Sequence, residues 1–217
     1  GGAVYQNIGA YGAELKDVIS FLDVYDTDLK KIRRLKPSEC EFEYRDSIFK
    51  KARGRNLIIT KVGLSLKKNG KPNLEYKDLL RLKSVKNLPL SEIRSEILRI
   101  RSGKFPDLSR FGTAGSFFKN PIVDENIYTA LVSRYPALPG YREKNGKIKI
   151  PLAWILDKVC LLKGHRQGNV GLFPNQPLVV VNYGDSRADE IINFTREIAN
   201  RVFEATGLAI ENEVRIL

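Results

Sequence analysis

The sequence lacks several residue types on which common enzyme chemistries depend. It contains no methionine, a single histidine (His165) and only two cysteines, Cys40 and Cys160, which stand far apart. Cysteines without paired spacing do not predict a zinc or thioredoxin-type site, and both are expected to be reduced, buried thiols. One histidine cannot build a histidine-based metal site, so no metal is expected.

Long apolar runs are also missing. No stretch approaches the roughly 18 to 20 consecutive apolar residues that a membrane span needs, and no signal-like segment opens the chain. A soluble, cytoplasmic protein without a membrane partner is therefore expected. The chain opens on Gly1-Gly2 without methionine, which predicts a truncated start. At 217 residues, with 42% hydrophobic and 29% charged residues, it is expected to fold as one or two domains.

Positive charge is in excess, with a formal net charge of +12. Such an excess favours anionic partners, either a nucleic acid or a phosphate-bearing small molecule. The basic residues are scattered, and neither an RNA-binding aromatic signature nor zinc-finger spacing accompanies them. A small anionic substrate is favoured, and a basic nucleic-acid-binding domain stays open as the alternative.

Three strands are predicted in the first half. Residues 18–25 are rich in β-branched and aromatic side chains, which is typical of a strand buried on both faces. Residues 40–45 alternate apolar and charged side chains, which predicts a strand that delivers Tyr44 and Arg45 to opposite faces at its end. In the third, alternate residues from Ile58 to Leu66 share one face, and a turn follows at residues 68–71.

Helices and strands are both predicted in the second half. The pattern predicts a helix from a Ser91 cap to about Arg101, ended by Gly103, and a long helix capped by Asp185 or Ser186 and ended by Gly207. The Gly-interrupted residues 112–121 are expected at a domain junction. The remaining predicted elements are helices near 124–135 and 152–159, a buried strand at 178–181 and a strand at 208–217.

Four segments, in order, resemble the signature segments of the UDP-N-acetylenolpyruvoylglucosamine reductase family. They are Gln-Asn-Ile-Gly-Ala-Tyr-Gly at 6–12, Tyr-Arg-Asp-Ser-Ile-Phe-Lys at 44–50, Ala-Gly-Ser-Phe-Phe-Lys-Asn-Pro at 114–121 and Glu-Val-Arg at 213–215. Each string alone is weak evidence, but together they extend over essentially the whole chain.

The resemblance implies an α+β fold. Residues 1–103 would form the second lobe of a vanillyl-alcohol-oxidase-type FAD-binding domain, whose first lobe would lie upstream. Residues 104–207 would form an α+β substrate-binding domain, and residues 208–217 a C-terminal strand that returns to the flavin site.

The same resemblance implies a function in bacterial cell-wall synthesis. The family reduces UDP-N-acetylglucosamine enolpyruvate to UDP-N-acetylmuramate, with FAD as cofactor and NADPH as hydride-donating co-substrate. The implied partners are these small molecules, without nucleic acid, and a monomer in the bacterial cytoplasm is expected. A flavin-binding fragment without activity stays open as another alternative.

Roles can be carried over to matching residues. Arg45 and Glu213 match residues that stabilise the intermediate, and Ser116 matches the proton donor. The matched substrate-side residues are Tyr44, Tyr76, Lys104, Asn120 and Gln176. The matched flavin-side residues are Gln6, Asn7, Ile8, Gly9, Ala10, Tyr11, Gly12, Arg101 and Arg215.

Structural explanations for these residues stay open beside the catalytic ones. Arg45 could pair with a surface acid, Ser116 could cap a turn, Glu213 could be a solvated strand residue, and Tyr76 could be ordinary packing. Two departures from the family pattern matter: residues 171–177 diverge around Gln176, and Asn212 replaces a common proline before Glu213.

Overall fold

The computed structural model describes residues 1–216 and divides into two compact units, Gly1–Glu96 and Ile97–Leu217. Both units combine helices and sheets, so the α+β class is confirmed at that level. No helix in the described part of the chain has the length and apolar character needed to cross a membrane.

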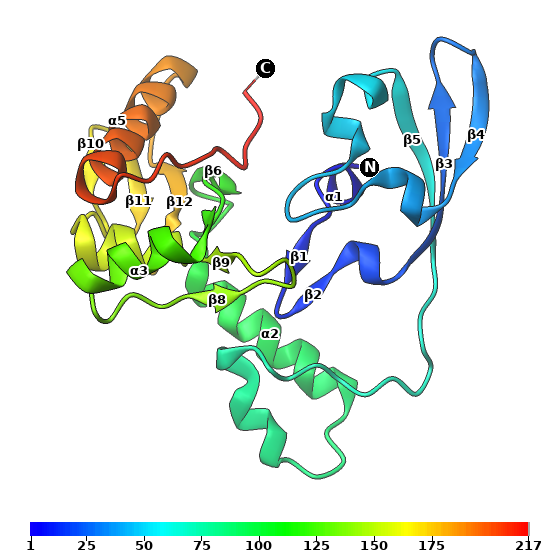
Figure 1. Ribbon diagram of the computed structural model, residues 1–217, viewed down its shortest axis with the longest axis horizontal. Coiled ribbons are helices and arrows are strands. Elements are labelled where there is room, and N and C mark those ends of the chain that lie inside the picture. The colour runs from blue at the N-terminus through cyan, green and yellow to red at the C-terminus, as the bar shows by residue number, and fades with distance from the viewer. Residues whose placement is uncertain (217) are drawn as a thin grey trace. The chain divides into compact units, whose positions relative to one another are not determined.

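The first unit is built on a three-stranded antiparallel sheet with the order β4-β3-β5 (Figure 1). β3 (Ile19–Asp26) lies in the middle, flanked by β4 (Lys31–Leu35) and β5 (Leu57–Leu64). Leu22 and Val24 of β3 are fully buried and pack in the core of this unit. The predicted strand at 18–25 is confirmed, but it is not buried on both faces, because Tyr25 is exposed.

A bulge in β5 makes the one-face prediction for residues 58–66 wrong. Asp23 pairs with Lys61 and its neighbour Val24 pairs with Ile59, so Thr60 is an extra residue in β5. A bulge shifts the alternation of the strand by one residue. The core therefore receives Leu57 and Ile59 before the bulge and Val62 after it, and Ile58 is exposed. Leu64, the last residue of β5, and Leu66, which follows the strand, are exposed as well.

Short elements complete the first unit. They are α1 (Gly2–Tyr5), β1 (Gly9–Ala10), β2 (Ala13–Glu14) and the 3₁₀ turns η1 (Leu15–Asp17), η2 (Pro37–Cys40), η3 (Ile48–Lys50), η4 (Ala52–Gly54) and η5 (Lys77–Ser84). The predicted strand at 40–45 is wrong. Cys40 ends a 3₁₀ turn, and Glu41 and Arg45 have φ values of 47° and 54°, which an extended strand does not accommodate.

Helix α2 (Leu90–Lys104) is longer than predicted. Ser91 lies inside the helix instead of capping it, and Gly103 does not end it. Three isoleucines at helical spacing form its apolar side: Ile93 is buried, and Ile97 and Ile100 are half-buried. In the first unit, the nearly buried Glu96 of α2 forms an ion pair with Arg81 of η5, which ties the two elements together.

The second unit contains an antiparallel sheet with the order β10-β11-β12-β6. Its strands are β10 (Arg166–Gln167), β11 (Val170–Phe173), β12 (Gln176–Asn182) and β6 (Gly112–Ser116), so residues 112–116 of the Gly-interrupted segment form a strand. A smaller sheet, β7-β9-β8, is formed by β7 (Ile122–Val123), β8 (Tyr141–Arg142) and β9 (Ile148–Lys149).

Helices of the second unit pack on this framework (Figure 1). They are α3 (Glu125–Arg134), α4 (Leu152–Trp154), which continues as the π-helical turn η6 (Ile155–Val159), and α5 (Ala188–Thr206). The predicted helices near 124–135 and 152–159 and the buried strand at 178–181 are confirmed. Their apolar residues meet in one core, to which Leu156, Val180 and Ile198 contribute.

The sequence predicted the C-terminal end of α5 correctly but not its N-terminal end. Gly207 ends the helix with φ 72°, as predicted. Arg187, not Asp185 or Ser186, is the N-cap, because Asn182 Oδ1 accepts hydrogen bonds from the backbone N–H groups of Gly184 and Ser186 and holds them in a turn. The predicted strand at 208–217 is also wrong: within its described part, Asn212 alone forms a bridge, with Phe118. Leu217 lies outside the described residues.

The core of the second unit predicts a large effect for one position on α5. Ile198 is fully buried, whereas Phe203 on the same helix is 56% exposed. Ile198→Ala should lower the free energy of unfolding by about 2–5 kcal/mol because it leaves a cavity, and Phe203→Ala should change it by about 0.5 kcal/mol or less. Urea denaturation measures both, and equal losses would contradict this packing.

The first unit should lose stability in acid. Arg34 donates two hydrogen bonds to Asp23, at 2.7 and 2.9 Å, and this contact lowers the pKa of Asp23 from its usual 3.8. A lowered pKa stabilises the fold at pH values above the unfolded-state value, and this contribution is lost as pH falls through the folded-state value.

Asp23→Asn should therefore reduce the difference in unfolding free energy between pH 6 and pH 3, as measured by urea titration at each pH. The same acid sensitivity in the variant and the wild type would show that the Asp23–Arg34 pair does not contribute to it.

Candidate functional site

A tight hairpin carries the predicted flavin segment in the first unit. Gly9 pairs with Glu14 and Ala10 with Ala13, and the two turn residues, Tyr11 and Gly12, have φ values of 53° and 79°. Positive φ at both central residues is the pattern of type I′ turns, which suit antiparallel hairpins. Gly12 meets this requirement easily, whereas Tyr11 adopts a conformation that few non-glycine residues take.

The hairpin leaves its backbone accessible. Ile8 is 45% exposed, and Gly9, Ala10 and Gly12 present little or no side chain. Gly9 has a further constraint, because an added Cβ would lie 2.9 Å from Glu14 Cγ and 3.3 Å from Arg45 Nη1. Small residues at an exposed turn allow a ligand to approach the main chain closely. The segment therefore fits the requirement for backbone contacts to a flavin.

Arg45 lies against this hairpin within the same unit. Its Nη2 donates a hydrogen bond of 2.8 Å to the carbonyl oxygen of Gly9, and the side chain is half-buried. Tyr44 precedes it, with the Arg45 guanidinium carbon 5.4 Å from the centre of the Tyr44 ring. The fold thus brings two segments with predicted roles, 6–12 and 44–45, into direct contact.

Tyr76 also reaches the hairpin. Its ring meets the Tyr11 ring edge-on, with 5.0 Å between the ring centres. Asn73, three residues earlier, donates a hydrogen bond of 3.0 Å from Nδ2 to the carbonyl oxygen of Gly12. These contacts place the loop before η5 on the predicted flavin segment, and they agree with either packing or a ligand-covering role for Tyr76.

In the second unit, Ser116 and Glu213 are neighbours. Ser116 ends β6, where it pairs with Val179. The next residue, Phe117, accepts a hydrogen bond of 2.7 Å at its carbonyl oxygen from the backbone N–H of Glu213. Residues 97 positions apart in the sequence are thereby joined through one peptide group. Both side chains are half-buried, a state that permits contact with a ligand.

The predicted substrate-side residues of the second unit occupy two places. Lys104 ends α2, and Asn175 Nδ2 donates a hydrogen bond of 2.9 Å to the adjacent Gly103 carbonyl, which brings the Gln176 segment beside Lys104. Asn120 Oδ1 accepts a hydrogen bond of 2.9 Å from the N–H of Leu152 at the start of α4. That contact fixes the Asn120 amide and turns its donor end away from Leu152.

Asn175 is a structural residue that the sequence did not reveal. An asparagine between proline and glutamine is typical of any turn, so no pattern marks it as the link between β12 and α2.

A hollow of about 570 Å³ lies between the end of α2 and β6 in the second unit. Gly115, directly before Ser116, and Arg101 both line it, and the Arg101 guanidinium lies 5.1 Å from the centre of the Phe105 ring. Phe105 lines the hollow too, and its other lining residues are Leu98, Ser102, Pro106, Asp107, Leu108 and Thr113. Arg215, the last predicted flavin-side residue, is exposed near the C-terminus.

Neither cysteine is suited to nucleophilic chemistry at neutral pH. Burial raises the pKa of the Cys40 thiol to about 11 and also raises the pKa of the Cys160 thiol. Within residues 1–216 there is no group of three or more His, Cys, Asp or Glu side chains that could hold a metal ion.

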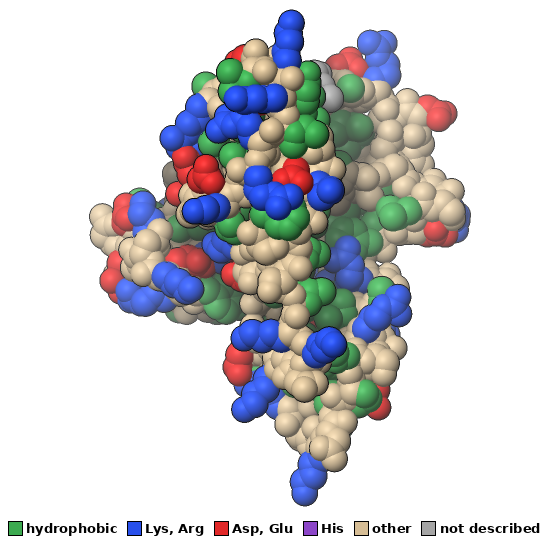
Figure 2. All heavy atoms as spheres, turned by 90° about the vertical axis from the view of Figure 1, so that its right-hand side faces the viewer, with side chains coloured by type: hydrophobic (Ala, Val, Ile, Leu, Met, Phe, Trp, Pro, Cys, Tyr) green, Lys and Arg blue, Asp and Glu red, His purple; other side chains and the backbone are tan. Residues whose placement is uncertain are grey.

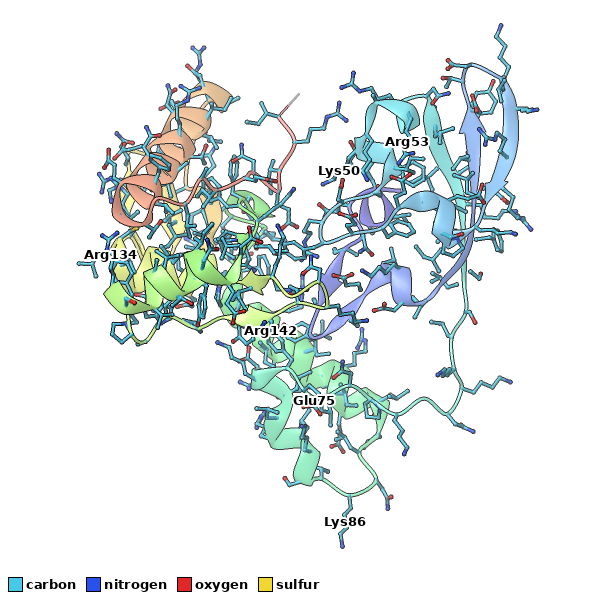
Figure 3. The ribbon with its side chains drawn as sticks, in the orientation of Figure 1. Lys50, Arg53, Glu75, Lys86, Arg134 and Arg142 are labelled. Carbon is cyan, nitrogen blue, oxygen red and sulfur yellow. The ribbon has the colours of Figure 1, made fainter. Side chains whose placement is uncertain are left out.

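Positive and negative side chains are mixed on one face of the protein. On the face shown in Figure 2, Lys and Arg side chains are spread over the surface with Asp and Glu among them. Several cations form local ion pairs, among them Arg33 with Asp26 and Lys51 with Glu41. Arg142, which is labelled in Figure 3, forms an ion pair with Glu125. On this face, the cations do not form the continuous basic stripe that tracks a nucleic-acid backbone.

Comparisons with known proteins agree with the motifs. The family model for the C-terminal domain of UDP-N-acetylenolpyruvoylglucosamine reductase matches residues 107–217. A curated UDP-N-acetylenolpyruvoylglucosamine reductase from Photobacterium profundum is 37% identical over 217 residues, covering 100% of this chain and 62% of the relative. One from Pasteurella multocida is 38% identical over 218 residues, covering 100% and 63%.

A solved structure is similar as well. The crystal structure of UDP-N-acetylenolpyruvylglucosamine reductase from Thermus caldophilus matches with a TM-score of 0.61 and 25% identity, covering 99% of this chain and 59% of that one. The chain therefore spans about three fifths of the length of the relatives it matches.

Proposed function

Because the chain belongs to the UDP-N-acetylenolpyruvoylglucosamine reductase family, we propose that it takes part in the NADPH-dependent reduction of UDP-N-acetylglucosamine enolpyruvate to UDP-N-acetylmuramate, with FAD as cofactor. The observation that supports this best is the pairing of Glu213 with Phe117, which places a carboxyl group and the Ser116 hydroxyl in one region of the second unit. The matched relatives carry the name of this reductase.

The proposed chemistry separates the hydride from the proton. FAD, when bound, supplies the hydride that it takes from NADPH to C3 of the enolpyruvyl group. Negative charge then develops at C2 and on the adjacent carboxylate of the substrate. Ser116 donates its hydroxyl proton to C2. A serine hydroxyl is a weak acid, so this transfer depends on its position beside a strongly basic carbon.

Arg45 and Glu213 have complementary tasks in this proposal. The planar guanidinium of Arg45 suits a carboxylate and stabilises the charge that develops there. Glu213 would act as a hydrogen-bond donor to the intermediate, since a carboxylate without a proton would repel its negative charge.

The remaining matched residues have binding roles in this proposal, toward either the flavin or the substrate. Residues 6–12, whose backbone is accessible from Ile8 to Gly12, would hold the flavin, with Arg101 and Arg215 as further candidates. Lys104 and the donor end of Asn120 would contact the diphosphate, where a point charge and an amide N–H suit phosphate oxygens. Tyr44 and Gln176 would contact the substrate, and Tyr76 would cover it.

The proton-donor role predicts a selective defect in Ser116→Ala. In the flavin-loaded protein, flavin reduction by NADPH should keep its rate, while reoxidation by the enolpyruvyl substrate should slow by about 10²- to 10⁴-fold because the acid is missing. Stopped-flow absorbance of the flavin follows each half-reaction separately. Ser133→Ala, an exposed change on α3, serves as the control. Equal slowing of both half-reactions would contradict the role.

Asn120→Asp tests the diphosphate contact. Aspartate keeps the acceptor for the Leu152 N–H, but its second oxygen replaces the amide donor with negative charge. KM for the UDP substrate should rise at least about tenfold, which corresponds to about 1.4 kcal/mol. The same exchange at the exposed Asn126 on α3 should leave KM unchanged. An unaltered KM in Asn120→Asp would remove Asn120 from the binding site.

A further inference from the structure

The turn that presents Arg45 has an uncommon backbone. Residues 43–46 form a tight turn in which the Asp46 N–H donates to the Glu43 carbonyl at 3.2 Å and the Glu43 N–H donates to the Asp46 carbonyl at 3.1 Å. Arg45, the third residue of the turn, has φ 54°. Four-residue turns with positive φ at the third position favour glycine, because a Cβ is crowded there. The arginine conformation therefore has to be held by its surroundings.

Asn7 holds the start of the turn. Its Nδ2 donates to the Glu43 carbonyl at 2.9 Å and to Glu14 Oε2 at 3.0 Å, and its Oδ1 accepts from the Lys16 N–H at 3.0 Å. The residue is fully buried, so its amide cannot exchange these bonds for water. Asn7 thus connects the Glu43 carbonyl to the hairpin against which Arg45 lies.

Lys50 holds the end of the turn. Its Nζ donates a hydrogen bond of 2.8 Å to the carbonyl oxygen of Arg45 itself. The same ammonium lies 5.8 Å from the centre of the Tyr5 ring of α1, within the range of a cation–π contact. Figure 3 shows Lys50 and Arg53 on neighbouring turns of the segment that follows Arg45. Lys50 therefore fixes the peptide plane that follows the strained residue.

We propose that Asn7 and Lys50 are positioning residues that lock the 43–46 turn and so aim the Arg45 guanidinium. The proposal rests on the function proposed above for Arg45. Without these contacts the turn relaxes toward ordinary backbone conformations, and the guanidinium loses its bond to the Gly9 carbonyl. A charge that must be reoriented during the reaction stabilises less than one that is already in place.

The experiment uses Lys50→Met in the flavin-loaded protein. Reoxidation of the reduced flavin by the enolpyruvyl substrate should slow by about 10- to 100-fold, because small misplacements of a catalytic group have effects of this size. Flavin reduction by NADPH should stay within about twofold of the wild-type rate. Lys50→Arg should restore most of the lost rate, since it can donate to the same carbonyl. Lys61→Met removes an equal charge from an exposed position on β5 and should have no effect.

A double-mutant cycle separates positioning from general destabilisation. Arg45→Gly removes the guanidinium and suits positive φ, so Lys50→Met should add little to the defect in that background. An equally large additional slowing in both backgrounds would overturn the proposal. So would a slowing of both half-reactions to the same extent in Lys50→Met.

Hydrogen exchange gives a readout that does not depend on activity. Lys50→Met should speed amide exchange in the peptide that contains residues 43–46 and leave exchange in β3 unchanged; unchanged exchange in the turn would also overturn the proposal.

If Lys50→Met does not fold, Lys50→Gln takes its place in every measurement. A wild-type protein without enolpyruvyl reduction would instead reject the proposed function, while faster turn exchange in the variant would still support the lock.

Discussion

The candidate site of the second unit depends on how the C-terminal segment pairs with the end of β6. The Glu213 N–H donates to the Phe117 carbonyl at 2.7 Å, and the Lys119 N–H donates to the Glu211 carbonyl at 2.9 Å. On its other side, the Phe117 N–H donates to the Leu178 carbonyl of β12 at 2.8 Å. Segment 117–119 therefore lies between β12 and the C-terminal segment, with Phe117 and Phe118 both buried. Backbone bonds at fixed spacing leave Ser116 and Glu213 little freedom to separate.

Long periodic elements could be predicted from the sequence because one feature decides them. The β-branched run predicted β12, and the apolar spacing with Gly207 at its end predicted α5 apart from its N-cap. Prediction failed where the residue pattern and the tertiary contacts favour different backbone conformations. Residues 40–45 alternate as a strand does, yet two of them, Glu41 and Arg45, adopt positive φ. Neither residue type signals that conformation, which is imposed by tertiary contacts such as the bond from Asn7 to Glu43.

For the candidate site, the motifs identified segments but not the contacts between them. The resemblance drew attention to residues 6–12 and 44–50, and within the first unit these do meet, through Arg45 and the Gly9 carbonyl. It assigned no task to Lys50, although that residue lies in the same motif and bonds the Arg45 carbonyl. A hydrogen bond from a side chain to a backbone carbonyl depends on the path of the chain, which residue types alone do not specify. Asn175 was missed for the same reason.

Backbone strain gathers around the predicted flavin segment. Seven non-glycine residues in the described chain have positive φ, and three of them, Asn7, Tyr11 and Arg45, belong to the connected group of hairpin and turn. Each such residue costs about 1–3 kcal/mol, which persists only where neighbours enforce the conformation. Here the hairpin and the turn hold each other in place through hydrogen bonds. A side chain at Gly9 would crowd Glu14 and the Arg45 guanidinium that bonds the Gly9 carbonyl, and Asn7 connects that hairpin to the turn that presents Arg45. A change at any one position therefore alters the geometry of the others, and this interdependence distinguishes a preorganised site from a set of independently tolerated surface residues.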